Sequence, residues 1–120
     1  MGEVRIMVGV RALNSNGHPG EKVEALADTG ATLTLLPAEI LRQAGVKPDG
    51  RVSVQLADGK TVEREAGHAW VSVDGRDTAC RLLFGTKEDA SLLGLTVLEQ
   101  LGLAVDPVQR RLVPSAFKLL

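Results

Sequence analysis

Aromatic residues, cysteine and histidine are scarce in this 120-residue sequence, and each shortage excludes a class of protein. Two phenylalanines, one tryptophan and no tyrosine leave the core to be built from aliphatic side chains. The single cysteine, Cys80, excludes an internal disulfide, and we expect it to be a small buried hydrophobe in a reducing compartment. One cysteine and two distant histidines, His18 and His68, are too few for a metal site, so we expect no metal and no cofactor.

An excess of one charge and long apolar runs are also lacking. Fourteen basic and fifteen acidic residues give a net charge of −1, which argues against a nucleic-acid or anionic membrane partner. No stretch approaches the roughly 20 apolar residues of a membrane span, and residues 1–6 do not begin a signal peptide. We therefore expect a soluble cytoplasmic protein, with residues 1–120 forming one domain.

What the sequence does contain is a series of short segments in which apolar and polar residues alternate. This period of two is typical of β-strands with one buried face. The predicted strands are residues 4–10, 21–27, 32–36, 51–56, 61–73 and 79–84, with a final pair at 103–105 and 111–113.

Turns and two brief helices separate these strands. Residues 14–20 are dense in turn formers, Asp58-Gly59 and Asp74-Gly75 predict hairpins, and Gly67 predicts a bulge or bend within a long strand. Residues 37–45 predict a helix with proline in its first turn, and residues 96–101 predict a second one. The pattern predicts a mostly β, small closed barrel-like domain with one or two short helices.

The chemistry concentrates in the stretch Asp28-Thr29-Gly30, which lies between two apolar strands. An acidic residue in such a place is unusual, because burying an unpaired charge is costly. Thr29 supplies a hydroxyl that can lock the loop, and Gly30 allows a tight turn or a close backbone approach. A carboxylate held on a rigid loop above an apolar core is suited to general acid–base chemistry.

This loop, followed by Ala31, resembles the active-site loop of retropepsins, the retroviral-type single-domain aspartic proteases. The family's second element, two apolar residues and a glycine before a short helix, is matched by Leu92-Leu93-Gly94. The resemblance extends from residue 21 to about residue 113, with the elements in the same order. It implies a retropepsin fold and an aspartic endopeptidase that cleaves peptides between apolar residues.

The resemblance also implies an obligate homodimer, because the chain carries one such aspartate and the reaction needs two carboxylates that share a proton. A two-fold axis would bring Asp28 against its copy, and Thr29 and Gly30 would form the contact between the loops. The hairpin at Asp58-Gly59 would close over a peptide as a flap. The residues implied to contact the peptide are Ala31, Leu56, Ala57, Asp58, Gly59, Leu92 and Leu93.

The sequence departs from the family at several positions. The residue after the motif is Ala31 rather than a serine, which removes a hydroxyl near the aspartates and should leave the pair less acidic than in pepsin, so we expect activity in mildly acidic to neutral solution. Leu95-Thr96 stands where the viral enzymes carry an arginine followed by an acidic or amide residue, so the dimer contact must differ or be weaker. Asp77-Thr78-Ala79 imitates the motif without its glycine, and we interpret it as structural.

Two other interpretations remain open. The first keeps the fold without the activity, as an inactive peptide-binding or dimerisation module. The second is an unrelated small β-barrel in which the Asp28 turn arises by chance.

Overall fold

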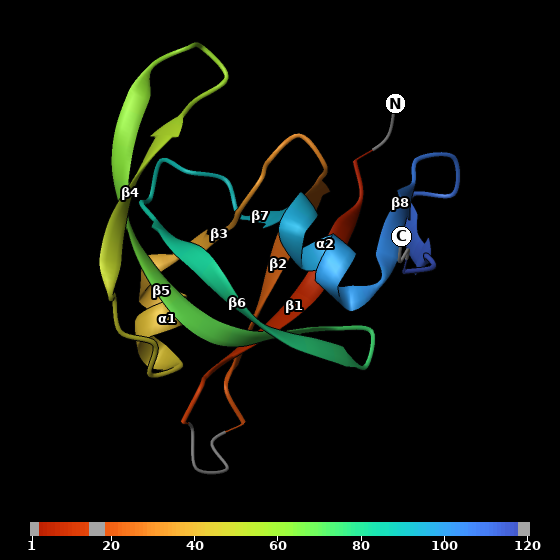
Figure 1. The fold of residues 1–120 in the computed structure, drawn as a ribbon, viewed down its shortest axis with the longest axis horizontal. Helices are drawn as coiled ribbons and strands as arrows, with labels where there is room; N and C mark the ends of the chain where they lie inside the picture. Colours follow the sequence, from red (N-terminus) through yellow and green to blue (C-terminus); the bar gives the residue numbers. More distant parts are fainter. Residues whose placement is uncertain (1–2, 15–18, 118–120) are drawn as a thin grey trace.

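The computed structural model describes residues 3–14 and 19–117, and within them the chain forms nine strands and two short helices (Figure 1). Their bounds are β1 Arg5–Ala12, β2 Glu21–Asp28, β3 Thr34–Pro37, α1 Ala38–Gln43, β4 Gly50–Gln55, β5 Thr61–Val73, β6 Arg76–Gly85, β7 Leu92–Gly94, α2 Leu95–Leu101, β8 Leu103–Asp106 and β9 Arg111–Pro114. None of the helices in the described residues is long and apolar enough to cross a membrane.

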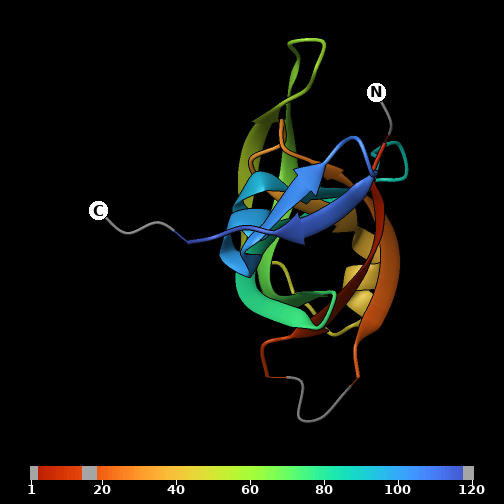
Figure 2. The same cartoon turned by 90° about the vertical axis from the view of Figure 1, so that its right-hand side faces the viewer.

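Seven of the described strands form one sheet in the order β1-β2-β7-β3-β6-β5-β4. β1 also pairs with β5, so the first six strands of this order, from β1 to β5, close into a barrel. β4, the last strand of the order, extends from it. Closure leaves no free edge among the six barrel strands over their paired residues, whereas β4 keeps one unpaired edge. β8 and β9 form a separate two-stranded sheet, which covers one side of the barrel (Figure 2). The predicted closed β-barrel with two short helices is confirmed.

The core is aliphatic, as the shortage of aromatic residues predicted. Its largest fully buried side chains are leucines and valines, among them Leu36, Leu82 and Leu98. Phe84 is the one aromatic side chain of the described residues in this core. Cys80 is also buried, and burial raises the pKa of its thiol to about 11, so it remains an uncharged thiol.

A glycine in the left-handed conformation lies at the C-terminal end of each helix. Gly45 (φ +85°) follows α1, and Gly102 (φ +69°) caps α2. The guanidinium of Arg76 donates to the carbonyl oxygens of Leu101 and Gly102, at 2.8 and 3.0 Å, and so satisfies the end of α2. Pro37 lies one position earlier than predicted, at the N-cap of α1 rather than inside its first turn.

The hairpins predicted at Asp58-Gly59 and Asp74-Gly75 are both confirmed. A bulge or a bend was predicted at Gly67. The structure contradicts the bulge, because the register between β5 and β6 continues through Gly67 without a break, but it does not contradict the bend. Gly67 lies where the neighbour on the other edge of β5 changes from β4 to β1. A Cβ there would come within 2.9 Å of the Lys47 carbonyl oxygen, so close packing explains the glycine. The turn predicted at 14–20, with His18, lies mostly outside the described residues.

Candidate active site

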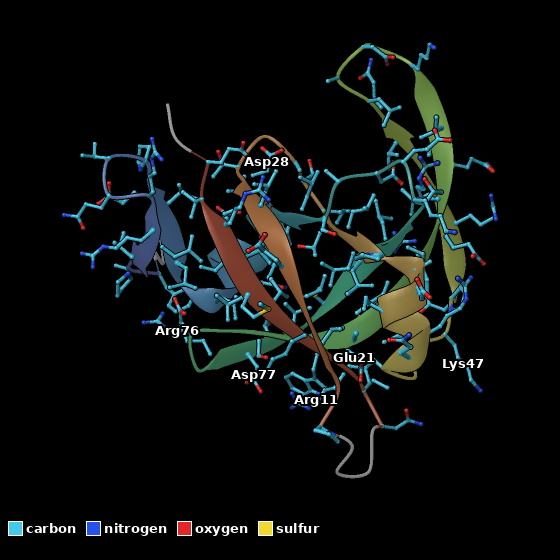
Figure 3. The ribbon with its side chains drawn as sticks, turned by 180° about the vertical axis from the view of Figure 1, so that it is seen from behind. Arg11, Glu21, Asp28, Lys47, Arg76 and Asp77 are labelled. Atoms are coloured by element: carbon cyan, nitrogen blue, oxygen red, sulfur yellow. The ribbon has the colours of Figure 1, made fainter. Side chains whose placement is uncertain are left out.

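Asp28 is the last residue of β2 and lies at the end of the barrel from which the β4–β5 hairpin projects (Figure 3). β2 pairs in parallel with β7, and this register sets Asp28 opposite Gly94. The Gly30 N–H donates to Oδ1 of Asp28 at 2.9 Å, and the Ala31 N–H donates to the Asp28 carbonyl oxygen at 3.2 Å. These two bonds form a tight turn that holds the half-buried carboxylate in one orientation, while Thr29 is exposed.

The loop rests on Leu92-Leu93-Gly94, as the resemblance implied for these residues. The Leu95 N–H donates to the Ala31 carbonyl oxygen at 2.8 Å, and the Thr96 N–H donates to that of Thr32 at 3.2 Å. A Cβ on Gly94 would lie 2.6 Å from the backbone of Leu33. The site loop and the start of α2 therefore touch backbone to backbone.

Thr34 completes this contact, and sequence reasoning missed it. Its side chain is fully buried, and its Oγ1 accepts the N–H of Gly94 at 2.9 Å. Thr34 is the one buried polar side chain among the described residues. The available signal was a hydroxyl inside the otherwise apolar run Leu33 to Leu36.

Thr34→Val should lower the free energy of unfolding by about 2 kcal/mol, because it leaves the buried Gly94 N–H without an acceptor at nearly constant volume. Thr34→Ser keeps the hydroxyl and should lose less, chiefly the contribution of one methyl group. Urea denaturation of both variants checks this. Equal losses for the two would show that the hydroxyl is not what matters.

A groove of about 480 Å³ lies between the Asp28 loop and β4. It is lined chiefly by apolar side chains and carries no charged residue: Gly30, Ala31, Thr32, Leu33, Leu35, Val52, Ser53, Val54, Gln55, Leu56, Leu83 and Leu92. Three of the residues implied to contact a peptide, Ala31, Leu56 and Leu92, therefore line it. Such a lining suits neutral, apolar side chains of a ligand.

The structure contradicts Leu93 as a contact residue. Leu93 is fully buried in the core, because successive residues of a strand point to opposite faces and Leu92 takes the face toward the groove. Ala57, Asp58 and Gly59 do not line the groove but form the exposed end of the β4–β5 hairpin. There Oδ1 of Asp58 accepts the Lys60 N–H at 2.9 Å and stabilises the turn, so peptide contact by these three residues remains a prediction.

No second Asp-Thr-Gly turn accompanies that of Asp28 in the described part of the chain. Asp77 forms an ion pair with Arg11 at 3.3 Å, far from Asp28 (Figure 3), which agrees with a structural role for the imitation motif. Glu3 shares a small hollow of about 250 Å³ with Asp28 and forms a surface ion pair with Arg5 at 3.2 Å. His68 is exposed and contacts Asp49.

One ion pair near the groove was not predicted from sequence. The guanidinium of Arg64 in β5 donates two hydrogen bonds to the carboxylate of Asp89, from Nε at 2.7 Å and from Nη2 at 2.9 Å. The backbone N–H and the hydroxyl of Thr86 also donate to this carboxylate, at 2.8 and 3.1 Å. These contacts, Arg64 first, hold the pKa of Asp89 at about 2.

This pKa predicts a loss of stability in acid. Because the pKa of Asp89 is about 2 in the folded chain and ordinarily 3.8, the unfolded chain takes up the proton first as the pH falls. The stabilisation is complete above about pH 4, and about 2 kcal/mol of it should be lost on reaching pH 2. Urea denaturation between pH 5 and pH 2 should show this loss in the wild type and a correspondingly smaller one in Asp89→Asn. Parallel curves would contradict it.

Comparison with known proteins identifies the family to which this chain belongs. The model of the family described as "gag-polyprotein putative aspartyl protease" matches residues 14–100. No curated protein sequence matches significantly.

Solved structures share the fold. The EIAV protease complexed with the inhibitor HBY-793 is 18% identical, with a TM-score of 0.63 over 84% of this chain and 89% of that one. The simian foamy virus (mac) protease is 20% identical, with a TM-score of 0.55 over 78% and 90%. A retropepsin-like aspartic protease from Rickettsia conorii is 20% identical, with a TM-score of 0.52 over 88% and 85%.

Proposed function

Because the chain belongs to the gag-polyprotein family of aspartyl proteases, we propose that two copies form an endopeptidase whose single active site lies between their Asp28 side chains. The family is one of peptide hydrolases and the fold is that of retropepsins. The observation that carries the proposal is Asp28 itself. Its carboxylate is held in one orientation beside an open apolar groove. The proposed reaction needs two such carboxylates, and one chain supplies one.

The proposed chemistry divides the work between the two carboxyl groups. One is ionised and takes a proton from a water molecule, which attacks the peptide carbonyl carbon. The other is protonated and donates a hydrogen bond to the carbonyl oxygen as negative charge develops on it. The C–N bond of the resulting tetrahedral intermediate then breaks, and the proton taken from water passes to the leaving nitrogen. Two carboxyl groups a few ångströms apart share one proton, and so they supply both forms at once.

The turn at Asp28 prepares the carboxylate for this role. The Gly30 N–H occupies Oδ1 of Asp28, which fixes the side chain before a substrate arrives. Gly30 lacks a Cβ, which would lie 3.2 Å from that oxygen, and this small residue allows the copies of the loop to approach. Thr29 is exposed, and in the proposed dimer its hydroxyl would hydrogen-bond across the two-fold axis.

The substrate we propose is an extended peptide with apolar side chains on both sides of the cleaved bond. It would lie as a strand between the β4–β5 hairpin and the loop, where the groove lining is neutral and largely aliphatic. With alanine at position 31, we expect activity in mildly acidic to neutral solution.

The test is cleavage of an unstructured peptide mixture at several enzyme concentrations. Cuts should cluster between apolar residues, and the specific activity should rise with enzyme concentration, because dilution separates the copies. A specific activity that stays flat down to nanomolar enzyme would contradict a site shared between loosely associated subunits. Complete absence of cleavage would favour an inactive peptide-binding module.

A further inference from the structure

The Arg64–Asp89 ion pair differs from the other ion pairs between described residues in its burial. Its two side chains are 15% and 13% exposed. Each of the others leaves about a third or more of both side chains in solvent. Nη1 of Arg64 also donates to the Glu63 carbonyl oxygen at 2.9 Å, so all three guanidinium nitrogens are engaged. A two-pronged, shielded contact of this kind is far stronger and more rigid than a surface pair.

Arg64 lies on the inner face of the β4–β5 hairpin. It is the cross-strand partner of Val52, and partners in such a register point to the same face of the sheet. Val52 lines the groove, and so does Val54, two residues further along β4. Arg64 is therefore a charged residue on a face that is otherwise apolar here.

Asp89 lies in the β6–β7 loop, just outside the opposite wall of the groove, which Leu83 and Leu92 line. Thr86 anchors the Asp89 carboxylate within the β6–β7 loop. Asp89 lies three residues before Leu92, which lines the groove. In Figures 1 and 3 this loop runs beside the base of the projecting hairpin. The ion pair thus joins the hairpin to the loop beside the opposite wall, between residues that lie 25 positions apart in the sequence.

Near its base the hairpin is also attached to α1, by the exposed pair between Arg42 and Glu65 at 3.0 Å, which lies outside the groove. Within the described strands β4 pairs with β5 alone, and β5 leaves β4 at Ala66, where it turns into the barrel. The hairpin would otherwise be free to swing about this base.

We propose that Arg64 and Asp89 form a latch that fixes the β4–β5 hairpin relative to the β6–β7 loop and so sets the width of the groove. The importance of this width for turnover rests on the proposed function, but the latch itself does not. Both are positioning residues, because neither lines the groove. The guanidinium of Arg64 is fully engaged by Asp89 and by the Glu63 carbonyl oxygen, so Arg64 does not select acidic peptides.

The first test is hydrogen exchange of the free protein, which needs no substrate. Arg64→Gln should speed amide exchange in residues 50–66 about tenfold or more, because the hairpin loses its contact with the β6–β7 loop. Exchange in β6, in the barrel, should not change. The matched control is Arg51→Gln, which breaks the exposed Arg51–Glu63 pair on the same hairpin and should leave exchange unchanged. Equal exchange in the two variants would overturn the latch.

Arg64→Lys provides a second variant, because it keeps the charge but loses the two-pronged geometry. It should give exchange between that of wild type and that of Arg64→Gln, and wild-type exchange in it would also overturn the proposal. This variant keeps the test decisive if Arg64→Gln proves too unstable.

The second test separates positioning from a general loss of stability. With an apolar peptide, Arg64→Gln should raise KM about fivefold and change kcat less than about twofold, since the Asp28 loop is untouched. An equal fall in the kcat of both Arg64→Gln and Arg51→Gln would contradict this. If wild type cleaves nothing, the proposed function fails, while the exchange test still decides the latch.

Discussion

Asp28→Asn should abolish peptide cleavage, with kcat at least about 10³-fold lower than in wild type. An amide takes no proton from water at these pH values, so the pair of side chains loses its base. The fold should survive, because Oδ1 of asparagine accepts the Gly30 N–H as the carboxylate does. The free energy of unfolding should therefore change by less than about 1 kcal/mol.

The matched control for this variant is Asp77→Asn. Asp77 opens the Asp77-Thr78-Ala79 imitation of the motif and forms an exposed pair with Arg11, so its loss should leave kcat and KM unchanged. Peptide cleavage followed by mass spectrometry compares the two variants. If Asp28→Asn kept more than about a tenth of the wild-type kcat, Asp28 would not be the base.

Gly94→Ala should produce the largest loss of stability, about 3 kcal/mol. Its Cβ would meet the backbone of Leu33 at 2.6 Å and the carbonyl oxygen of Ala31 at 3.0 Å. These atoms belong to the loop that follows Asp28, and they move only if the hydrogen bonds between Gly94 and Thr34 and between Leu95 and Ala31 lengthen. Cleavage activity should fall as well, because the displaced loop carries Asp28.

Gly50→Ala is the control for the added methyl group. A Cβ at Gly50 would have Arg81 Nη2 as its nearest neighbour, at 3.7 Å, which is an ordinary contact. This variant should unfold within about 0.5 kcal/mol of wild type. Thermal and urea denaturation compare the two alanines. Equal stability would show that the loop and β7 are not in the tight contact described here.

Strands and turns were predictable where the signal was local. The alternation in residues 61–73 gave β5 with its bounds as the structure has them, and Asp74-Gly75 gave the hairpin after it. The turn at Asp28 was predictable as well, because a turn motif with a carboxylate between two apolar strands is visible within ten residues. Patterns of this kind need no knowledge of which strands become neighbours.

Interactions between distant segments were not predictable in this way. Nothing near Thr34 in the sequence shows that its hydroxyl meets Gly94, and nothing near Arg64 points to Asp89. Leu93 failed for a related reason, because the motif alone does not say which of two adjacent leucines faces the groove. Only the parallel pairing of β2 with β7 decides that.

The shared active site is tested most directly by mixing wild type with Asp28→Asn at constant total protein and letting the subunits exchange. At equal amounts about a quarter of random dimers hold two Asp28 residues, so the rate should fall to about one quarter of that of wild type alone. A rate of one half would mean that each subunit works alone, and it would contradict the proposal that one site is built from two copies of Asp28.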